Sequence, residues 1–453
     1  MLACGLLFAG DAASQQDWPR FGWDVGRSSA PTVSMRLSAG TVGKLRRQQV
    51  TLPGTVDASA IYLHAVTVGD ASHDVVFVTT TYGKTLAIDV DRGTILWEYT
   101  APGYAGTYQV TTATPAADPD RAHIYAAAPD GTIQKLAVAD GSVVWRTSVT
   151  GLPRREKLAA SLTVFRGGLI ATTGGYIGDA PPYQGHVAVL DATSGALLHV
   201  WNSLCSGRRQ LIHPASCRAS GSAIWGKAGA VIDSATGHIF VATGNGPWDG
   251  QDNWGDAVIE LDADAATLLG NYTPVNTDQL EARDADLGST SPVLLGGGLV
   301  VQGGKDGDLR LLDWSTLRGA TPHRGGEKQI VSTPSGGAMF TAPAVWHADS
   351  TTWLFAADGG GTAAWTLRRG ALESSWHNGQ AGTSPVVVDG LLLVYDPRGG
   401  LRVYEARTGR PIATLECGSG HWNSPIVADG RIVLPEGNSN DEGLSGVLDI
   451  WRP

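Results

Sequence analysis

The sequence predicts an all-β protein, namely an eight-bladed β-propeller of four-stranded antiparallel blades. Gly accounts for 60 of the 453 residues, well above its usual share of ~7%, and each helical Gly costs about 1 kcal/mol. A phrase of short β-runs separated by Gly and Asp turns recurs along the chain. One such sheet alone would leave both faces in water, whereas sheets packed face to face around an axis cover each other.

The composition favours a large buried core and excludes one class of partner. Hydrophobic residues make up 42% of the chain and charged residues 17%, so the chain is not disordered. The formal net charge is −10. Because nucleic acid attracts basic surfaces, we expect no nucleic-acid partner.

The first residues resemble the end of a secretory signal peptide. Residues 2–9 are apolar and are followed by small and polar residues. We therefore interpret 1–16 as a signal-peptide remnant and 17–453 as a single propeller domain in a periplasmic or secreted protein. The alternatives are a lipoprotein signal around Cys4 and a terminus without fixed structure. No later stretch has the ~18 apolar residues of a membrane span.

The repeat itself ends its third strand in Asp and turns on Gly. In 75–99 this is Asp89 followed by Gly93, which fits a tight turn with the Asp side chain bonding the backbone and Gly at positive φ. Trp97, and Trp145 in the next copy, follow the turn. We expect these residues to wedge between neighbouring blades, an explanation that extends to most of the fifteen Trp.

Proline marks the start of five units, because a missing N–H costs little where a strand opens. These prolines are Pro115, Pro292, Pro343, Pro385 and Pro425. With Ser59, Ala160 and Ser222 as weaker equivalents, the chain has eight units. The last unit stops at 447–453 without an outer strand, so we expect strands near the N-terminus to close the ring.

Two polar segments are too long for blade turns, and we expect them to cover one mouth of the funnel. They are 176–185 and 202–220. Within the second, Cys205 and Cys217 are expected to form a disulfide, the alternative being two unrelated thiols. Cys417 is then left unpaired.

The repeat resembles that of the pyrroloquinoline quinone (PQQ) enzyme family, the quinoprotein alcohol dehydrogenases. The resemblance rests on Leu86-Ala87-Ile88-Asp89 with Gly93 and Trp97, and on the opening Trp18-Pro19-x-x-Gly22-x-Asp24. It implies an eight-bladed propeller with an axial funnel. Non-catalytic scaffold propellers of outer-membrane assembly share these repeats, so the fold alone leaves the chemistry open.

Three further stretches resemble the cofactor site of the dehydrogenases. The resemblance implies that Trp225 is the floor under the quinone and that Asn245 ligates calcium. It implies a catalytic base at Asp284, with Asp286 next, and makes Asp284 a calcium ligand as well. Lys305 would contact the quinone oxygens.

The function implied is PQQ- and calcium-dependent oxidation of an alcohol or a sugar. A planar acid suits an aromatic floor and a cationic side chain. Its oxygens suit a hard cation, which polarises the reactive carbonyl. A small-molecule substrate and an electron acceptor would be the partners.

The chain departs from the family at two points. The family's second calcium ligand is a Glu, but residues 172–179 contain none, and Asp179 is the substitute carboxylate. The adjacent cysteine pair of many alcohol dehydrogenases is also absent. Calcium then binds weakly, another carboxylate replaces the Glu, or the site no longer holds PQQ.

The alternative function is a non-catalytic periplasmic scaffold or ligand-binding propeller, with a protein as partner. Each candidate residue also has a structural explanation: blade packing for Trp225, a turn for Asn245, and solvated loops for the remaining charged residues. Their occurrence together, in the family's order, favours the cofactor site. His186, His213 and His421 have no neighbours at metal-binding spacing, so surface or core roles are expected for them.

Overall fold

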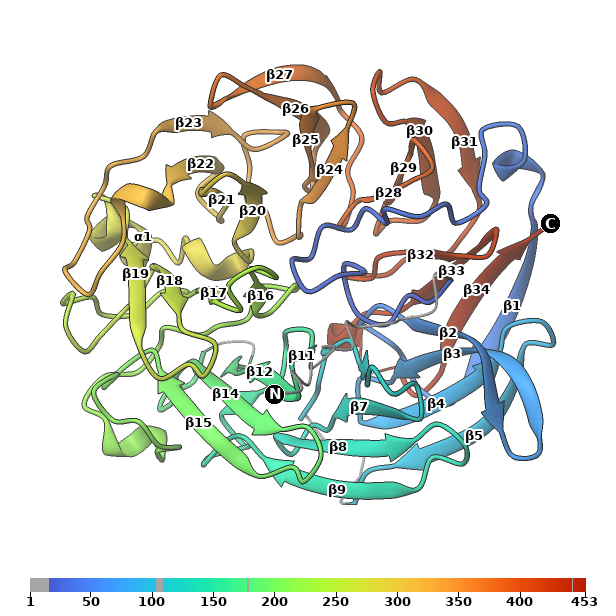
Figure 1. Cartoon of the computed structure of the whole chain (residues 1–453), viewed down its shortest axis with the longest axis horizontal. Coiled ribbons are helices and arrows are strands. Elements are labelled where there is room, and N and C mark those ends of the chain that lie inside the picture. The colour runs from blue at the N-terminus through green and yellow to red at the C-terminus, as the bar shows by residue number, and fades with distance from the viewer. Residues whose placement is uncertain (1–15, 103–108, 177–178, 442) are drawn as a thin grey trace, which may run out of the picture.

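The computed structural model is a ring of eight β-sheets arranged around an axis (Figure 1). The structure describes residues 16–102, 109–176, 179–441 and 443–453. The predicted eight-bladed propeller of four-stranded antiparallel blades is confirmed. Cys4 and nearly all of the predicted signal-peptide remnant lie outside the described residues.

Each of the first four blades runs in chain order from its innermost to its outermost strand. Blade 1 holds β2 (Ile61–Val68), β3 (Ala71–Thr79), β4 (Lys84–Asp89) and β5 (Thr94–Thr100); blade 2 holds β6 (Ala116–Ala117), β7 (His123–Ala127), β8 (Thr132–Ala137) and β9 (Val143–Ser148); blade 3 holds β11 (Thr163–Phe165), β12 (Gly168–Thr172), β14 (His186–Asp191) and β15 (Leu197–Asn202); blade 4 holds β16 (Val231–Ile232), β17 (Ile239–Ala242), β18 (Val258–Leu261) and β19 (Leu268–Tyr272).

The other four blades have the same order, except that the last borrows its outer strand from the start of the chain. Blade 5 holds β20 (Val293–Gly296), β21 (Leu299–Gln302), β22 (Asp308–Asp313) and β23 (Gln329–Ser332); blade 6 holds β24 (Ala344–Ala348), β25 (Thr351–Ala357), β26 (Thr362–Arg368) and β27 (Ala371–Asn378); blade 7 holds β28 (Val386–Val388), β29 (Leu391–Tyr395), β30 (Leu401–Glu405) and β31 (Pro411–Leu415); blade 8 holds β32 (Ile426–Ala428), β33 (Arg431–Glu436), β34 (Gly446–Arg452) and β1 (Arg46–Leu52).

Helices are few and short among the described residues. The single α-helix, α1, covers Thr277–Ala282, and five 3-10 turns accompany it: η1 (Val42–Lys44), η2 (Pro214–Ser216), η3 (Leu287–Ser289), η4 (Trp314–Thr316) and η5 (Ser439–Asp441). None of these helices has the length and apolar character needed to cross a bilayer. A further strand pair, β10 (Glu156–Lys157) with β13 (Gly174–Gly175), lies outside the eight blades.

The ring is closed by antiparallel pairing of β1 with β34, from Arg46 opposite Arg452 to Leu52 opposite Gly446. The pairing gives blade 8 its fourth strand, so this blade has as many strands as the other seven and β34 is not left as an unpaired edge. The opening segment also packs inward, because Trp18 is 1% exposed and exchanges two backbone hydrogen bonds of 2.9 Å with Tyr62.

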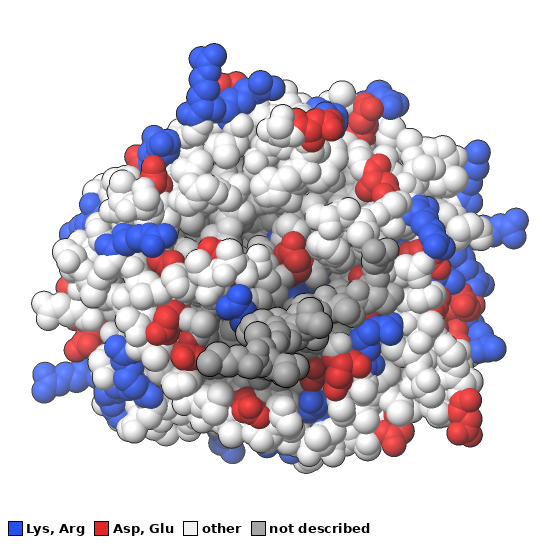
Figure 2. Space-filling view, in the orientation of Figure 1, with Lys and Arg blue, Asp and Glu red and all other residues white. Residues whose placement is uncertain are grey.

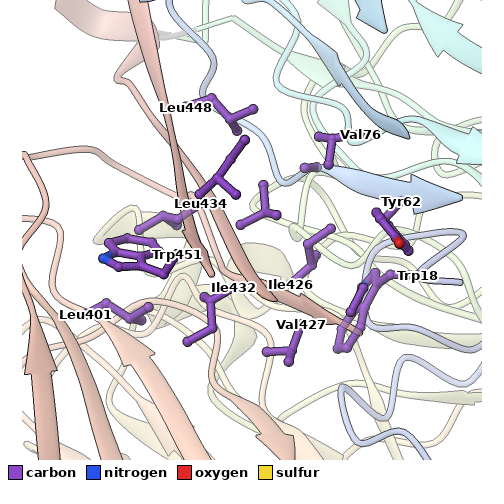
Figure 3. Close-up of a cluster of buried hydrophobic side chains, with 14 of the residues drawn as sticks. Trp18, Tyr62, Val76, Leu401, Ile426, Val427, Ile432, Leu434, Leu448 and Trp451 are labelled. Atoms are coloured by element: carbon purple, nitrogen blue, oxygen red, sulfur yellow. The ribbon is translucent and has the colours of Figure 1, made fainter. Parts of the chain in front are cut away.

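The hydrophobic core lies between neighbouring blades all the way around the ring, rather than at a single centre. Figure 3 shows the cluster that joins blades 7, 8 and 1, where Trp18 and Tyr62 face Ile426 and Trp451 lies near Leu401. Because every blade buries both faces in this way, removal of one interface weakens the whole ring.

The turns between third and fourth strands form as predicted. The amide of Gly93 donates to the Asp89 carbonyl at 2.8 Å, Asp89 Oδ1 accepts two backbone N–H groups, and Gly93 has φ +66°. These turns receive a Trp from the preceding blade. The Trp97 indole N–H donates to the Val138 carbonyl at 2.8 Å, and its ring lies where a Cβ on Gly141 would come within 2.7 Å.

We call this arrangement a blade latch: an outer-strand Trp that donates to a backbone carbonyl of the next blade and packs on its turn Gly. Trp145 forms one with Ala192 at 3.3 Å, and Trp376 forms another with Ala406 at 2.9 Å. The prediction that Trp97 and Trp145 wedge between blades is therefore confirmed.

The cysteine prediction is confirmed as well, since Cys205 and Cys217 form a disulfide, whereas Cys417 is a half-buried free thiol. One predicted strand start is wrong. Ser222 does not open blade 4, because the innermost strand begins at Val231. Residues 221–230 instead form the loop that leads to that strand.

Candidate functional site

The connections between strands determine which residues meet at the hub, the axial region at the inner ends of the blades. In an antiparallel blade, the loop between the second and third strands leaves by the same edge as the loop to the next blade. Asn245 and Lys305 lie in loops of the first kind, whereas Trp225 and Asp286 lie in loops of the second kind. All four therefore belong to one face of the ring.

These residues line one cavity of about 290 Å³, which we call the hub cavity. Its walls come from loops of blades 3, 4 and 5 and from the loops that precede blades 3, 6 and 8. The lining residues are Lys157, Ala159, Gly175, Tyr176, Asp179, Tyr183, Ala223, Trp225, Asn245, Asp286, Lys305, Phe340 and Trp422. A larger groove of about 650 Å³ lies elsewhere and holds none of the predicted site residues.

Lys305 joins the two candidate carboxylates. Its ammonium forms an ion pair with Asp286 and lies 3.2 Å from Asp284 Oδ2. The Asp286 side chain is only 9% exposed and faces the cavity, whereas the Asp284 side chain is 73% exposed and does not line it. The structure thus brings Asp286 into the site and leaves Asp284 at its outer edge.

The charge states of this pair follow from burial and ion pairing. Burial raises the pKa of Asp286, although Lys305 acts in the opposite direction. Burial by itself would lower the pKa of Lys305, but ion pairing with Asp286 outweighs it, so the pKa is raised. Lys305 is therefore a permanent cation beside a carboxylate that binds protons more readily than usual.

Asn245 connects the carboxylates of two blades. Its backbone N–H donates to Asp286 Oδ1 at 2.6 Å, and its side-chain Nδ2 donates to Asp256 Oδ2 at 3.4 Å. The side-chain Oδ1 is buried and has no hydrogen-bond partner in the described part of the chain. An unsatisfied buried carbonyl oxygen is costly, so this atom is a ready ligand for a cation or a donor.

Asp256 is a member of the site that the sequence analysis missed. It is fully buried, and burial raises its pKa to about 8. Its other oxygen accepts the Leu287 amide at 2.9 Å. The available signal was its place two residues before β18, in the loop between the second and third strands of blade 4.

Trp225 contacts one cationic group and two aromatic rings. The Lys305 ammonium lies 5.5 Å from the centre of its ring, and the rings of Trp422 and Phe340 lie 5.8 and 6.0 Å away. Trp225 is partly exposed and lines the cavity. Trp422 and Phe340 were missed, yet each stands three residues before a strand-opening proline, at Pro425 and Pro343.

The predicted substitute for the missing Glu also lines the cavity. The residue Asp179 is exposed, yet partial burial of its carboxylate, followed by repulsion from Asp286, raises its pKa. A carboxylate with a raised pKa gains from any cation that binds beside it. The geometry therefore gathers Trp225, Asn245, Asp179, Asp286 and Lys305 at one cavity, and their roles stay predictions.

The three singled-out histidines lie in polar contacts of the scaffold. His186 is buried between Asn202 and Glu156, and the His213 side chain accepts the Ala215 amide at the start of η2. His421 Nδ1 lies 2.8 Å from Asp57 Oδ2. In none of these places do they form a metal-binding cluster with other described residues.

Comparisons with known proteins agree with this architecture. A family model described as outer membrane protein assembly factor BamB matches residues 63–210. Polyvinylalcohol dehydrogenase of Sphingopyxis sp. (strain 113P3) is 25% identical over 209 residues, which cover 43% of this chain and 31% of that protein. The match therefore spans under a third of the relative's length.

Solved structures resemble the chain over nearly its whole length. The quinohemoprotein alcohol dehydrogenase from Comamonas testosteroni has a TM-score of 0.71 at 16% identity, covering 98% of this chain and 81% of that one. The quinohemoprotein alcohol dehydrogenase ADHIIG from Pseudomonas putida HK5 has a TM-score of 0.73 at 13% identity, covering 99% and 82%. At sequence identities this low, the structural likeness shows only that the fold is shared. The chain is therefore an eight-bladed propeller, as the sequence analysis predicted, and its residues 63–210 match a PQQ-repeat family model.

Proposed function

We propose that this chain is an exported, quinoprotein dehydrogenase-like propeller that holds PQQ and calcium in the hub cavity and oxidises an alcohol or a sugar. The observation that carries the proposal is the convergence of Trp225, Asn245, Asp286 and Lys305 on one cavity. The Cys205–Cys217 disulfide supports export, since such bonds persist in oxidising compartments.

The side chains present fit a planar acid. Trp225 supplies an aromatic ring to the cavity wall, and the Lys305 ammonium lies over that ring. The cavity of about 290 Å³ lies at the small end of ligand sites, which suits a flat ligand. When bound, PQQ supplies a quinone carbonyl that accepts hydride from the substrate.

The oxygen donors fit a hard cation. Asn245 Oδ1 is buried and unpartnered among the described residues, and the carboxylates of Asp286 and Asp179 line the same cavity. Calcium prefers such carbonyl and carboxylate oxygens. Burial already disfavours the charged forms of both carboxylates, so a cation would offset that cost.

The geometry favours Asp286 over Asp284 as the proton acceptor. Asp286 faces the cavity, while Asp284 is largely in solvent. Asp286 Oδ1 accepts the Asn245 amide and Oδ2 pairs with Lys305, which hold the carboxylate in one orientation. Each carboxylate oxygen retains a second lone pair, so Asp286 can still accept a hydroxyl proton from a substrate.

A second candidate is a non-catalytic scaffold or ligand-binding propeller. Two observations favour it: the family match is to an assembly factor, and no Glu occurs among the described residues that line the cavity. Figure 2 shows acidic and basic side chains interspersed over the surface in that view. A protein partner that docks on this face would meet charges of both signs.

The direct test is a titration of the whole chain with PQQ, with and without Ca²⁺, followed by tryptophan fluorescence. We expect saturable quenching that is tighter with Ca²⁺, and turnover of an alcohol with an artificial electron acceptor. Absence of saturable binding in both metal states would remove the cofactor proposal and leave the scaffold.

A matched pair of variants tests the role of Asp286. Asp286→Asn should lower turnover by about 10²–10⁴-fold, the usual contribution of a general base. Asp284→Asn, two residues away and in solvent, should stay within a few-fold of the wild type. Equal losses in the two variants would contradict the assignment of the proton acceptor to Asp286.

A further inference from the structure

Three lysines lie around the hub, and among the described residues only one of them, Lys157, has neither an ion pair nor a hydrogen-bond acceptor for its ammonium. Lys305 is paired with Asp286 and Asp284. Lys227, 3% exposed, donates from Nζ to the carbonyls of Thr112 at 2.6 Å and Asp57 at 3.2 Å. Lys157 is 6% exposed, and its ammonium has no hydrogen bond or ion pair with any described residue, although the carboxylates of Asp57 and Asp179 attract it without direct contact.

The Lys157 side chain belongs to the hub cavity. It lines the cavity together with Tyr176, and its ammonium lies 5.6 Å from the centre of the Tyr176 ring. A cation–π contact compensates only part of the cost of removing an ammonium from water. Burial accordingly lowers the pKa of Lys157.

The strand that carries Lys157 is placed against Trp225. Lys157 pairs directly with Gly174 in the short β10–β13 ladder. A Cβ on Gly174 would lie 3.1 Å from Trp225 Cβ, so the backbone of this ladder contacts the tryptophan. Lys157 and Trp225 line the same cavity, so a flat ligand that contacts Trp225 lies in the space that Lys157 also borders.

We propose that Lys157 is the anion-binding group of the hub cavity and holds a carboxylate of the planar ligand that stacks on Trp225. The proposal rests on the proposed function, in that the hub cavity is the ligand site. A buried ammonium that lacks a counter-ion loses stability in the free protein and regains it when an oxyanion binds. Lys157 thus selects carboxylate-bearing aromatic ligands over neutral ones of the same shape.

The test compares Lys157→Met with Lys157→Arg and with the control Lys227→Met in the full chain. The probes are PQQ and its trimethyl ester, which keeps the rings and loses the carboxylates. We expect Lys157→Met to weaken PQQ binding by about 10-fold to 100-fold, the scale of a charged hydrogen bond, and to leave ester binding unchanged. Lys157→Arg should retain much of the affinity for PQQ.

Thermal unfolding separates binding from scaffolding. Without ligand, Lys157→Met should unfold at the wild-type temperature or above, because it removes an unpaired buried charge. Lys227→Met should unfold at a lower temperature and bind PQQ as the wild type does, because Lys227 joins two loops outside the cavity lining. A Lys157→Met protein that binds PQQ at wild-type strength, or that loses acid and ester equally, would overturn the proposal.

A third probe keeps the two proposals distinct. If the wild type fails to bind PQQ in either metal state, the proposed function fails, and quinoline-2,4-dicarboxylate then tests Lys157 as a smaller planar dianion. Tighter binding of this dianion by the wild type than by Lys157→Met supports the anion site. Equal binding, or none by either protein, overturns it.

Discussion

The tryptophans of the blades and those of the hub differ in what their rings contact. In a blade latch, the Trp97 indole N–H donates to a backbone carbonyl of the next blade, and the ring covers Gly141. At the hub, Trp225 contacts a lysine ammonium and two aromatic rings from distant loops. Repetition therefore marks the structural tryptophans, and unrepeated surroundings mark the one that belongs to a cavity.

This difference shows how a repeat protein separates stability from binding. The latches of Trp97, Trp145 and Trp376 have the same partners in each blade, a turn carbonyl and a turn Gly. The hub loops differ from blade to blade, so their residues meet only once. A change in a latch should therefore affect unfolding, and a change at the hub should affect binding.

The largest effect is expected from Trp97→Ala. This residue is 9% exposed and packs against the turn of blade 2, so its truncation leaves a cavity between two blades. We expect a loss of ~3–5 kcal/mol in the free energy of unfolding, measured by urea denaturation. A loss no larger than that of Trp225→Leu would break the distinction between latch and hub.

A smaller effect is expected from Asp57, a buried hub carboxylate that does not line the cavity. Its carboxylate accepts the N–H groups of His421 and Ser439, and these bonds, together with nearby Lys227, outweigh burial and lower its pKa to about 2. Because the folded pKa lies below the unfolded one, the carboxylate stabilises the protein above pH ~4 and loses this effect toward pH 2.

The size of this contribution is about 2 kcal/mol, from a pKa difference of nearly two units. Urea midpoints between pH 2 and 7 should fall steeply for the wild type and less steeply for Asp57→Asn. Parallel curves for the two proteins would show that Asp57 is not part of the acid response, and would place the structural carboxylates elsewhere.

The Trp225→Leu variant should separate stability from ligand binding most clearly. Trp225 is partly exposed and its ring faces the cavity, so the free energy of unfolding should change by less than ~1 kcal/mol. The affinity for PQQ should fall by about 10-fold to 30-fold through loss of aromatic contact area. Loss of stability with unchanged affinity for PQQ would show that Trp225 has a structural role, as the blade tryptophans do.

The smallest effect is expected where the ring closes. There the latch position is occupied by Gln48, whose Nε2 donates to the Arg92 carbonyl at 3.0 Å and covers Gly93. Gln48→Ala should cost about 1 kcal/mol of unfolding free energy, the usual net value of such a bond. A loss as large as that of Trp97→Ala would show that the closing junction is no weaker than the others.

Some of the site could be predicted because its signals are local. The repeated Asp–Gly turns and strand-opening prolines predicted eight blades, and the resemblance of three stretches to the dehydrogenase cofactor site predicted Trp225, Asn245, Asp286 and Lys305. Asp284 was ranked above Asp286, because sequence alone does not reveal which of two nearby carboxylates is buried. Ser222 was wrongly predicted to open a strand, because the sequence does not show that its loop runs to the hub before β16 begins.

Other residues of the site could not be predicted from the sequence, because their roles depend on packing between distant blades. Lys157 and Asp256 carry no motif, and only burial shows that their charges lack compensation. Trp422 lies far along the chain from Trp225, yet their rings are 5.8 Å apart. Such pairs form when eight inner strands converge on one axis.

The amino-acid sequence alone therefore determined the repeat, the number of blades, the turns, the latches and the disulfide, because each depends on contacts between neighbouring segments. Only the tertiary structure decided which side chains line the hub cavity and which ammonium there has neither an ion pair nor a hydrogen-bond acceptor among the described residues. The reason is physical: the cavity is bounded by loops from most of the ring, and the charge state of a buried group depends on everything that surrounds it.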